Sequence, residues 1–354
     1  MITLILIILV ISLLILVHEW GHFYSARKFG VRVEEFGFGF PPRVYSKVKS
    51  GIRYSFNLLP FGGFVKIFGE HGEGEDDPQS FMSRPVWQRF VILAAGVFMN
   101  FAAAWFFFSI GSAVGIPQVS DDTSSGPVSI IGILPDSPAE QAGLKFGDKI
   151  FELKSRDLSI RVEGEKDVSD FMQAYRGEEV TVVVGRGDSV ENFRATPRVN
   201  FPEGEGPLGI AIARLIVVRT PWYFAPFEGL KTLYRSVVVT AGGLYFVVRD
   251  LVMGRGADVA VSGPVGIFFF ADDVRSLGLA YFLQFIGMLS VNLAVLNFLP
   301  IPALDGGRIF FLCIEKIKGS RVSPVVENFA HTIGFVLLIF LMLIVTYRDI
   351  VKIF

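Results

Sequence analysis

The sequence predicts a mainly α polytopic membrane protein with about four transmembrane helices, a membrane-associated β-hairpin and an inserted α+β domain. Three observations lead to this fold class. The 354 residues are 51% hydrophobic, with a mean hydropathy of +0.51, which is too apolar for an ordinary soluble protein. Four apolar runs are long enough to cross a bilayer. A polar block at residues 120–214 separates the second run from the third.

The four apolar runs lie at residues 1–24, 90–115, 277–299 and 330–347. Because a helix rises 1.5 Å per residue, about 20 apolar residues span the hydrocarbon core. A fifth run at 237–248 is too short to span comfortably, and Arg235, Arg249 and Asp250 close its ends. It predicts an amphipathic helix at the membrane interface. A short fifth span is the alternative.

Basic residues predict the orientation of the chain. Residues 27–89 contain ten Lys or Arg, which places this loop in the cytoplasm. The amino terminus and the polar block then lie outside. A net charge of -1 gives no indication of nucleic-acid binding. The single cysteine, Cys313, excludes an internal disulfide and a Cys-rich metal cluster.

A hairpin signal lies within the first loop, at residues 51–70. Two apolar or alternating runs flank the sequence PFGG at residues 60–63. These runs are more apolar than a solvated hairpin needs, so we expect the hairpin to dip into the membrane. Backbone at that depth must be paired, and an open edge there would accept another strand. The predicted domains are then an N-terminal membrane part at 1–115, the inserted domain at 120–214, a linker with the amphipathic helix at 215–276 and a C-terminal membrane part at 277–354.

The first apolar run contains the pattern HEWGH. His18 and His22 share one helix face, so both imidazoles can bind one metal ion. Glu19 can reach a water molecule at that metal. HExxH is the zinc metalloprotease pattern of two ligands and a general base. Chance and a hydrogen-bonded histidine pair are the alternatives. Ionisable residues inside an apolar segment are costly, which favours a functional site, and a histidine pair leaves Glu19 unexplained.

The candidate third ligand is Asp305, in the sequence NFLPIPALDGGRIFF. A catalytic zinc usually has three protein ligands and one open position. Asp305 is the only acidic residue between Asp273 and Glu315. Pro300 and Pro302 interrupt the helix just before it. An aspartate that caps the following helix is the alternative, but a cap does not require so apolar a setting.

These motifs resemble the site-2 protease family of intramembrane zinc metalloproteases, and more narrowly its bacterial PDZ-containing branch of the sigma-E regulator type. The matching pieces are HEWGH, NFLPIPALDGG, SGPVGI at residues 262–267 and the Gly-containing hairpin. The resemblance implies Zn²⁺ held by His18, His22 and Asp305, with Glu19 as the base. The resemblance also implies a substrate-binding set of Asn292, Asn297, Pro300, Pro302, Gly62 and Gly63. For Asn292, a hydrogen bond between helices is an equally good explanation.

Residues 129–153 resemble a bacterial PDZ domain. A strand at 128–134 precedes the helix SPAEQAGL and the turn GDKI, and a second helix is expected at 168–175. Strands near 180–184 and 192–198 would complete the domain. PDZ domains add a peptide strand beside one of their own. The groove is predicted between strand 128–134, with Ile131, Gly132 and Ile133, and helix 168–175. A size filter that blocks bulky substrates is the alternative role.

The sequence therefore favours an enzyme: a zinc metalloendopeptidase that cuts in or near the transmembrane segment of single-span proteins, of the anti-sigma factor or remnant signal peptide type, in regulated intramembrane proteolysis. The expected partners are these substrates, an upstream site-1-type protease and the lipid bilayer of the bacterial inner membrane. A PDZ-containing adaptor with a non-catalytic metal site is the alternative, but it would not need Glu19. A zinc carrier would need several polar sites, and the spans contain one cluster.

Overall fold

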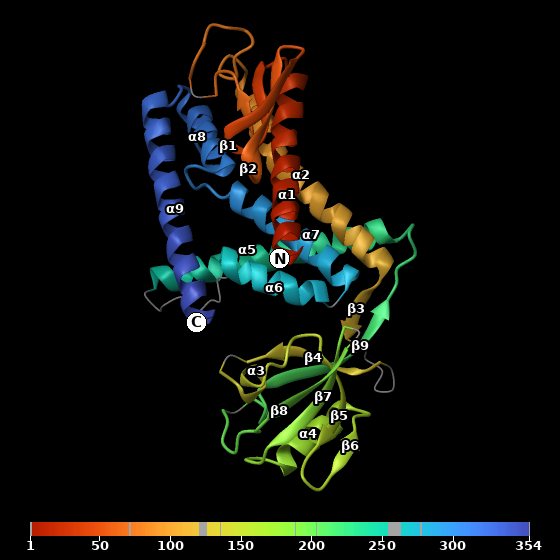
Figure 1. The fold of residues 1–354 in the computed structure, drawn as a ribbon. Coiled ribbons are helices and arrows are strands. Elements are labelled where there is room, and N and C mark those ends of the chain that lie inside the picture. The colour runs from red at the N-terminus through yellow and green to blue at the C-terminus, as the bar shows by residue number, and fades with distance from the viewer. Residues whose placement is uncertain are drawn as a thin grey trace. The chain divides into compact units, whose positions relative to one another are not determined.

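The computed structural model describes residues 2–70, 72–119, 126–134, 136–187, 189–202, 204–253, 263–276 and 278–353. Ser262 of the SGPVGI motif and residues 120–125, 135, 188 and 203 of the predicted inserted domain lie outside these ranges. The chain divides into two compact units (Figure 1). The first comprises Met1–Ile110, Pro226–Ala271 and Leu283–Phe354, and the second comprises Gly111–Ala225 and Asp272–Phe282.

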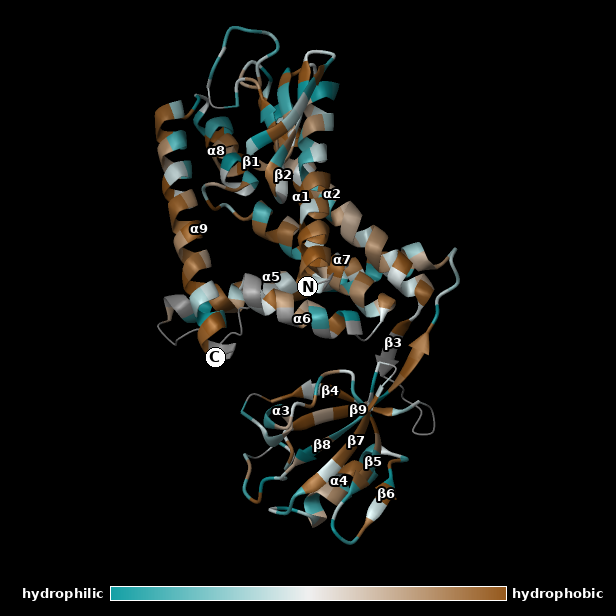
Figure 2. Cartoon of the chain, in the orientation of Figure 1, coloured by the Kyte–Doolittle hydropathy of each residue, from teal (hydrophilic) through white to brown (hydrophobic). Residues whose placement is uncertain are grey.

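Among the described residues, four helices are long and apolar enough to cross a membrane. They are α1 (Ile2–Lys28), α2 (Val86–Val114), α7 (Leu279–Phe298) and α9 (Pro324–Ile353). Each overlaps one of the apolar runs over most of its length, so the four predicted spans are confirmed as helices, and the chain is an integral membrane protein. Figure 2 shows long hydrophobic stretches along all four.

Three further helices belong mainly to the first unit. They are α5 (Ala225–Val252), α6 (Pro264–Ser276) and α8 (Asp305–Lys318). The short apolar run at 237–248 is part of α5, which is not among the candidate spans. Leu233 and Val237 of α5 pack against the buried cluster of Ala104, Phe108 and Val291 from α2 and α7. At the start of α6, the Gly266 N–H donates to Asp349 Oδ2 of α9 at 2.8 Å.

The first loop forms a β-ribbon of two long strands, β1 (Val33–Lys49) and β2 (Ile52–Ile67). They are joined at Ser50 and Gly51, whose φ angles of 51° and 78° fit the turn that right-handed strand twist favours. Glu35 is buried in the ribbon and forms ion pairs with Arg43 at 2.9 Å and Arg53 at 3.6 Å.

The hairpin predicted at residues 51–70 needs correction. Its two runs were expected to pair with each other around residues 60–63, but both belong to β2 and both pair with β1. Residues 35–38 of β1 have Cα partners at 53–56 and again at 63–66, so this part of β1 lies between two segments of β2. The turn signal at 60–63 lies where the pairing of β2 with β1 is interrupted, between residues 59 and 63, and Gly62 there has a φ of 82°. The apolar pattern did not reveal that β1 supplies the partner strand.

The second unit is built on a seven-stranded sheet. Its order is β3 (Ile116–Val119), β9 (Ile210–Val218), β4 (Val128–Ile133), β5 (Lys149–Lys154), β7 (Val180–Arg186) and β8 (Ser189–Ala195), with β6 (Ser159–Arg161) paired to β5. Two helices accompany it, α3 (Pro138–Gln141) and α4 (Glu165–Ala174). The core includes Ile130, Ile150, Leu153, Val168 and Phe171.

The groove predicted along β4 also needs correction. Gly132 and Ile133 pair with Ala211 and Ile210 of β9, so this edge of β4 is already occupied. The strands expected from the sequence ended near residue 198, and β9 was not among them. It is β9 that reaches α4, because the Arg214 N–H donates to Glu165 Oε1 at 3.0 Å. Ile131 lies on β4 between Ile130 and Gly132, which pair with Ile212 and Ala211 of β9.

A candidate metal centre between α1, α2 and α8

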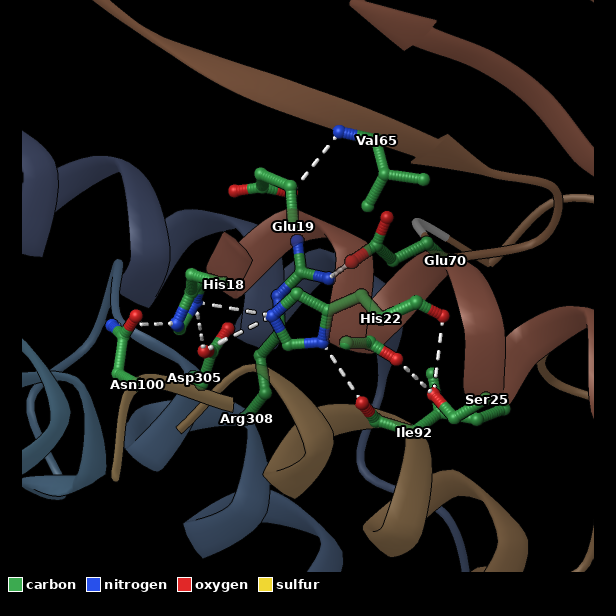
Figure 3. Close-up of polar contacts among 11 residues, drawn as sticks. His18, Glu19, His22, Ser25, Val65, Glu70, Ile92, Asn100, Asp305 and Arg308 are labelled. Atoms are coloured by element: carbon green, nitrogen blue, oxygen red, sulfur yellow. Dashed lines mark hydrogen bonds and ion pairs between the residues drawn. The ribbon is translucent and has the colours of Figure 1, made fainter. Parts of the chain in front are cut away.

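The two histidines of HEWGH lie one turn apart on the same face of α1. Both are buried, and their Nε2 atoms are 3.1 Å apart. A helix returns to the same face after four residues, so the spacing read from the sequence is sufficient to bring these two imidazoles together. Figure 3 shows both rings directed away from the β-ribbon, toward the start of α8.

Asp305, the first residue of α8, completes the cluster. Its Oδ2 atom lies 2.9 Å from His18 Nε2 and 3.3 Å from His22 Nε2. Asp305 Oδ2 is buried and accepts no hydrogen bond from the described residues. Among these residues, the ligand-type atoms of His18, His22 and Asp305 all fall within 4.8 Å of one another.

This arrangement fits a zinc ion. Tetrahedral zinc lies about 2.0–2.2 Å from nitrogen and oxygen ligands, so neighbouring ligand atoms are separated by about 3.3–3.5 Å. The separations of 2.9, 3.1 and 3.3 Å among the three side chains are close to these values. A buried carboxylate oxygen without a hydrogen bond is costly unless a cation compensates it. Two imidazoles and one carboxylate are also one of the donor sets found in catalytic zinc sites.

The second nitrogen of each histidine contacts α2. His22 Nδ1 lies 2.8 Å from the main-chain oxygen of Ile92, so Nδ1 carries the proton and Nε2 is left with its lone pair. His18 Nδ1 lies 3.3 Å from the side-chain nitrogen of Asn100, whose Oδ1 is buried without a hydrogen bond. Rotation of this amide by 180° places Oδ1 against His18 Nδ1 as an acceptor. Both imidazoles then present Nε2 to a metal. In metal sites, a hydrogen bond from the other ring nitrogen commonly fixes the histidine tautomer in this way.

Two glycines allow α1 and α2 to approach closely at the cluster. A Cβ atom at Gly21 would lie 2.4 Å from the Ala95 oxygen. A Cβ atom at Gly96 would lie 2.3 Å from His22 Nε2 and 2.7 Å from His18 Cε1. Small residues bring membrane helices into backbone contact, and here they bring α2 against the imidazoles.

The two glycines after Asp305 allow the start of α8 to approach the preceding main chain closely. A Cβ atom at Gly306 would lie 2.1 Å from the Leu299 oxygen, and one at Gly307 would lie 2.4 Å from the Ile301 oxygen. The first turn of α8 therefore packs on the main chain that leads to it. This packing holds Asp305 at the end of a short loop after α7.

Glu19 points from α1 toward the β-ribbon (Figure 3). Its Oε2 atom accepts the Val65 N–H of β2 at 3.1 Å. Nearby on α1, Ser12 Oγ donates to the Pro60 oxygen at 2.6 Å and accepts the Gly62 N–H at 3.3 Å. Residues 60–65 of β2 therefore follow α1 beside the candidate base.

Two charged pairs hold α8 in place. Arg308 pairs with Glu70, which follows β2 (Figure 3). Arg89 of α2 forms two hydrogen bonds to the Glu315 carboxylate, at 3.0 and 2.5 Å. The Arg89 side chain is only 3% exposed. Planar two-point contacts of this kind fix geometry as well as charge.

The predicted substrate-binding residues fall into two groups. Gly62 and Gly63 lie on β2 against α1, and a Cβ atom at Gly63 would be 4.0 Å from Glu19 Cγ. Asn292 Oδ1 accepts a hydrogen bond from Thr240 of α5 at 2.9 Å, which is the interhelical role considered as its alternative. Asn297 is partly buried near the end of α7, and Pro300 and Pro302 lie in the loop before Asp305.

The structure adds residues that the sequence reasoning did not select. Asn100 was recognisable as the one strongly polar residue of its span, and such residues commonly have a functional contact. Gly96 and Ile92 carried no signal of their own, because their importance depends on how α2 packs against α1. Arg308 and Glu70 are far apart in the chain, and neither sequence neighbourhood indicates the pairing.

Comparison with known proteins agrees with the geometry. Residues 6–341 match the profile of Peptidase family M50. A Fusobacterium nucleatum protein named as a putative zinc metalloprotease is 33% identical over 98% of each chain. A Clostridium perfringens protein with the same designation is 32% identical over 97% of each chain. The zinc metalloprotease RasP of Oceanobacillus iheyensis is 27% identical over the full length of both chains. The chain belongs to Peptidase family M50, the site-2 protease family.

Proposed function

We propose that this protein is an intramembrane zinc endopeptidase that hydrolyses peptide bonds in or near the transmembrane segment of single-span membrane proteins. The observation that carries the proposal is the convergence of His18, His22 and Asp305 at the junction of three helices, two of them candidate spans. His18, His22 and Asp305 hold Zn²⁺, which, when bound, polarises the scissile carbonyl and lowers the pKa of water toward about 7.

Glu19 is the general base and then the general acid in this proposal. A Glu19 carboxylate oxygen takes a proton from the attacking water and later gives it to the nitrogen of the leaving amine. His22 donates its Nδ1 proton to the Ile92 oxygen, and His18 donates its Nδ1 proton to Asn100 once the amide is rotated, so in this proposal neither histidine is needed as a proton carrier. These roles, with two histidines as metal ligands and the glutamate as general base, are those of the HExxH motif in zinc peptidases.

The β-ribbon provides the peptide-binding edge. A transmembrane helix satisfies its own peptide groups, so it must unwind before it can be cut, and addition to a strand edge compensates the freed groups. The Val65 N–H points at α1 and is bonded to Glu19. A substrate strand added along residues 63–67 would take this N–H and release Glu19 for proton transfer. Gly62 and Gly63 leave room for the substrate main chain, and Asn297, Pro300 and Pro302, which lie at the end of α7 and in the loop before Asp305, are proposed to contact the substrate near the site.

The charges and α5 support a proposed placement in the membrane. Residues 27–89 face the cytoplasm, and the amino terminus and second unit lie outside the bacterial inner membrane. In Figure 1, α5 runs across the direction of α1 and α9. Phe227, Tyr234 and Tyr245 on one side of α5 are exposed. Such a helix suits the plane of the membrane interface.

The second unit is proposed to be a PDZ-type domain that acts on substrates or their trimmed ends. Among the described strand pairings, residues 210–214 of β9 pair with β4 on one edge, and β3 meets only residues 215–218. This leaves a short stretch of β9 beside α4 for a peptide strand. An upstream site-1-type protease would trim substrates before they reach the membrane centre, and a size-filter role is the alternative.

The proposal is tested with purified full-length chain in detergent and a single-span model substrate. Wild type is compared with Glu19→Gln and Asp305→Asn, and zinc content is measured for each protein. We expect Glu19→Gln to keep zinc and to cut about 10²–10⁴-fold more slowly, because a positioned general base contributes about this factor. Asp305→Asn should lose zinc and activity together. Asp170→Asn, on the exposed surface of α4, is the matched control and should behave as wild type.

Two outcomes would contradict the proposal. If Glu19→Gln cuts as fast as wild type, the general-base assignment is wrong. If wild type holds zinc but cuts no single-span substrate, an adaptor with a non-catalytic metal site becomes the better explanation.

A further inference from the structure

The loop that delivers Asp305 contains an unfavourable backbone conformation. Residues 301–304 form a β-turn, in which the Leu304 N–H donates to the Ile301 oxygen at 3.2 Å. Pro302 occupies the second position of this turn, and Ala303 occupies the third with a φ of 79°. A turn with Pro second and a positive φ third is of type II, and the third position normally requires glycine. A side chain at this position is disfavoured in the left-handed region.

Helix α9 contacts both ends of the peptide group between Pro302 and Ala303. The Ala303 N–H donates to His331 Nδ1 at 2.8 Å. At the other end, a Cβ atom at Gly334 would lie 2.3 Å from the Pro302 oxygen, so the α9 main chain lies against this carbonyl. In a type I turn the same peptide group is rotated by about 180°, and its N–H would point away from His331. The contacts therefore favour the type II turn.

We propose that His331 is a positioning residue for the metal ligand Asp305. By accepting the Ala303 N–H, His331 holds the turn in the form that Ala303 alone would resist, and this sets where Asp305 begins α8. The inference rests on the proposed role of Asp305 as a zinc ligand. Neither HEWGH nor the LDGG sequence includes His331, which lies 26 residues after Asp305 in the chain.

The test is a double-mutant cycle that combines substitutions at His331 and Ala303. The ring centroids of His331 and Phe311 are 5.8 Å apart. His331→Phe keeps a ring beside Phe311 but removes the hydrogen-bond acceptor. His331→Asn retains an acceptor oxygen near the Nδ1 position. Ala303→Gly removes the side chain that disfavours a positive φ. Thr332→Ala is the matched control, because the Thr332 hydroxyl donates to the Asn328 oxygen within α9.

The main readout is zinc retained by the purified chain under chelator competition, followed by substrate cleavage and thermal stability. We expect His331→Phe to weaken zinc retention by roughly tenfold, as for other outer contacts of metal ligands. His331→Asn and Thr332→Ala should stay within about threefold of wild type. Adding Ala303→Gly to His331→Phe should restore most of the lost retention, because glycine accepts the turn without help.

Failure of this rescue would overturn the inference, as would wild-type zinc retention by His331→Phe. If His331→Phe does not fold, Ala303→Val supplies the answer with His331 intact. A β-branched residue resists positive φ, so Ala303→Val should lose zinc, and wild-type retention by this variant would overturn the inference. A wild-type chain that binds no zinc would contradict the proposed function instead, and this result is seen before any variant is compared.

Discussion

His22 Nδ1 lies 2.8 Å from the main-chain oxygen of Ile92, and this contact determines which nitrogen of His22 faces Asp305. A main-chain oxygen only accepts hydrogen bonds, so Nδ1 must donate and Nε2 keeps its lone pair. The acceptor belongs to α2, a different helix from the histidine. The metal centre therefore depends on the distance between α1 and α2 as much as on HEWGH itself.

We predict that Gly96→Ala will disrupt the centre. The added Cβ would lie 2.3 Å from His22 Nε2, so either the imidazole or α2 must move, and overpacking costs about 1–3 kcal/mol. Zinc content and thermal unfolding in detergent measure both effects. Gly243→Ala on α5 is the control, because a Cβ there meets no atom within 4 Å. Normal zinc content in Gly96→Ala would show that α2 can retreat without affecting the histidines.

Asn100 provides a second prediction. Asn100→Leu removes the polar partner of His18 Nδ1 and should weaken zinc affinity by about 10–100-fold. Asn100→Asp keeps an oxygen acceptor and should lose less. Zinc affinity by competition with a chromophoric chelator distinguishes the two variants. Equal affinities for Leu and Asp at this position would mean that the hydrogen bond does not orient His18.

Removing the metal should lower the stability of the chain as well as its activity. A ligand that binds only the folded state stabilises it by about 2.7 kcal/mol at 100 times its Kd. Treatment with a zinc chelator should therefore lower Tm and abolish cleavage, and added zinc should restore both. Asp305→Asn serves as the control, because its Tm should not respond to the chelator. A chelator-insensitive wild type would argue against a bound metal.

The Arg89–Glu315 pair should be important for stability rather than for chemistry. Its two hydrogen bonds join α2 to α8, and the Arg89 side chain is buried. Arg89→Met leaves Glu315 without this partner and should lower the free energy of unfolding by about 3–5 kcal/mol. Arg89→Met with Glu315→Leu should recover much of the loss. Detergent unfolding curves test this pair, and a double variant no better than the single one would exclude a charge effect.

The sequence by itself determined the features that depend on neighbours along the chain. The four apolar runs became helices because their length and composition suit a membrane, and His18 and His22 met because four residues complete a helical turn. Asp305 was identifiable because an acidic residue in an apolar stretch requires a partner. These are local properties, and they need no knowledge of the fold.

Only the tertiary structure decided what lies beside these segments. It placed Asn100 and Ile92 against the histidines, paired both halves of β2 with β1 rather than with each other, and set β9 on the edge of β4 where a groove was expected. It also brought His331 to the turn before Asp305. Such contacts join residues far apart in the chain, and they depend on backbone hydrogen bonds and close packing, which residue spacing does not encode.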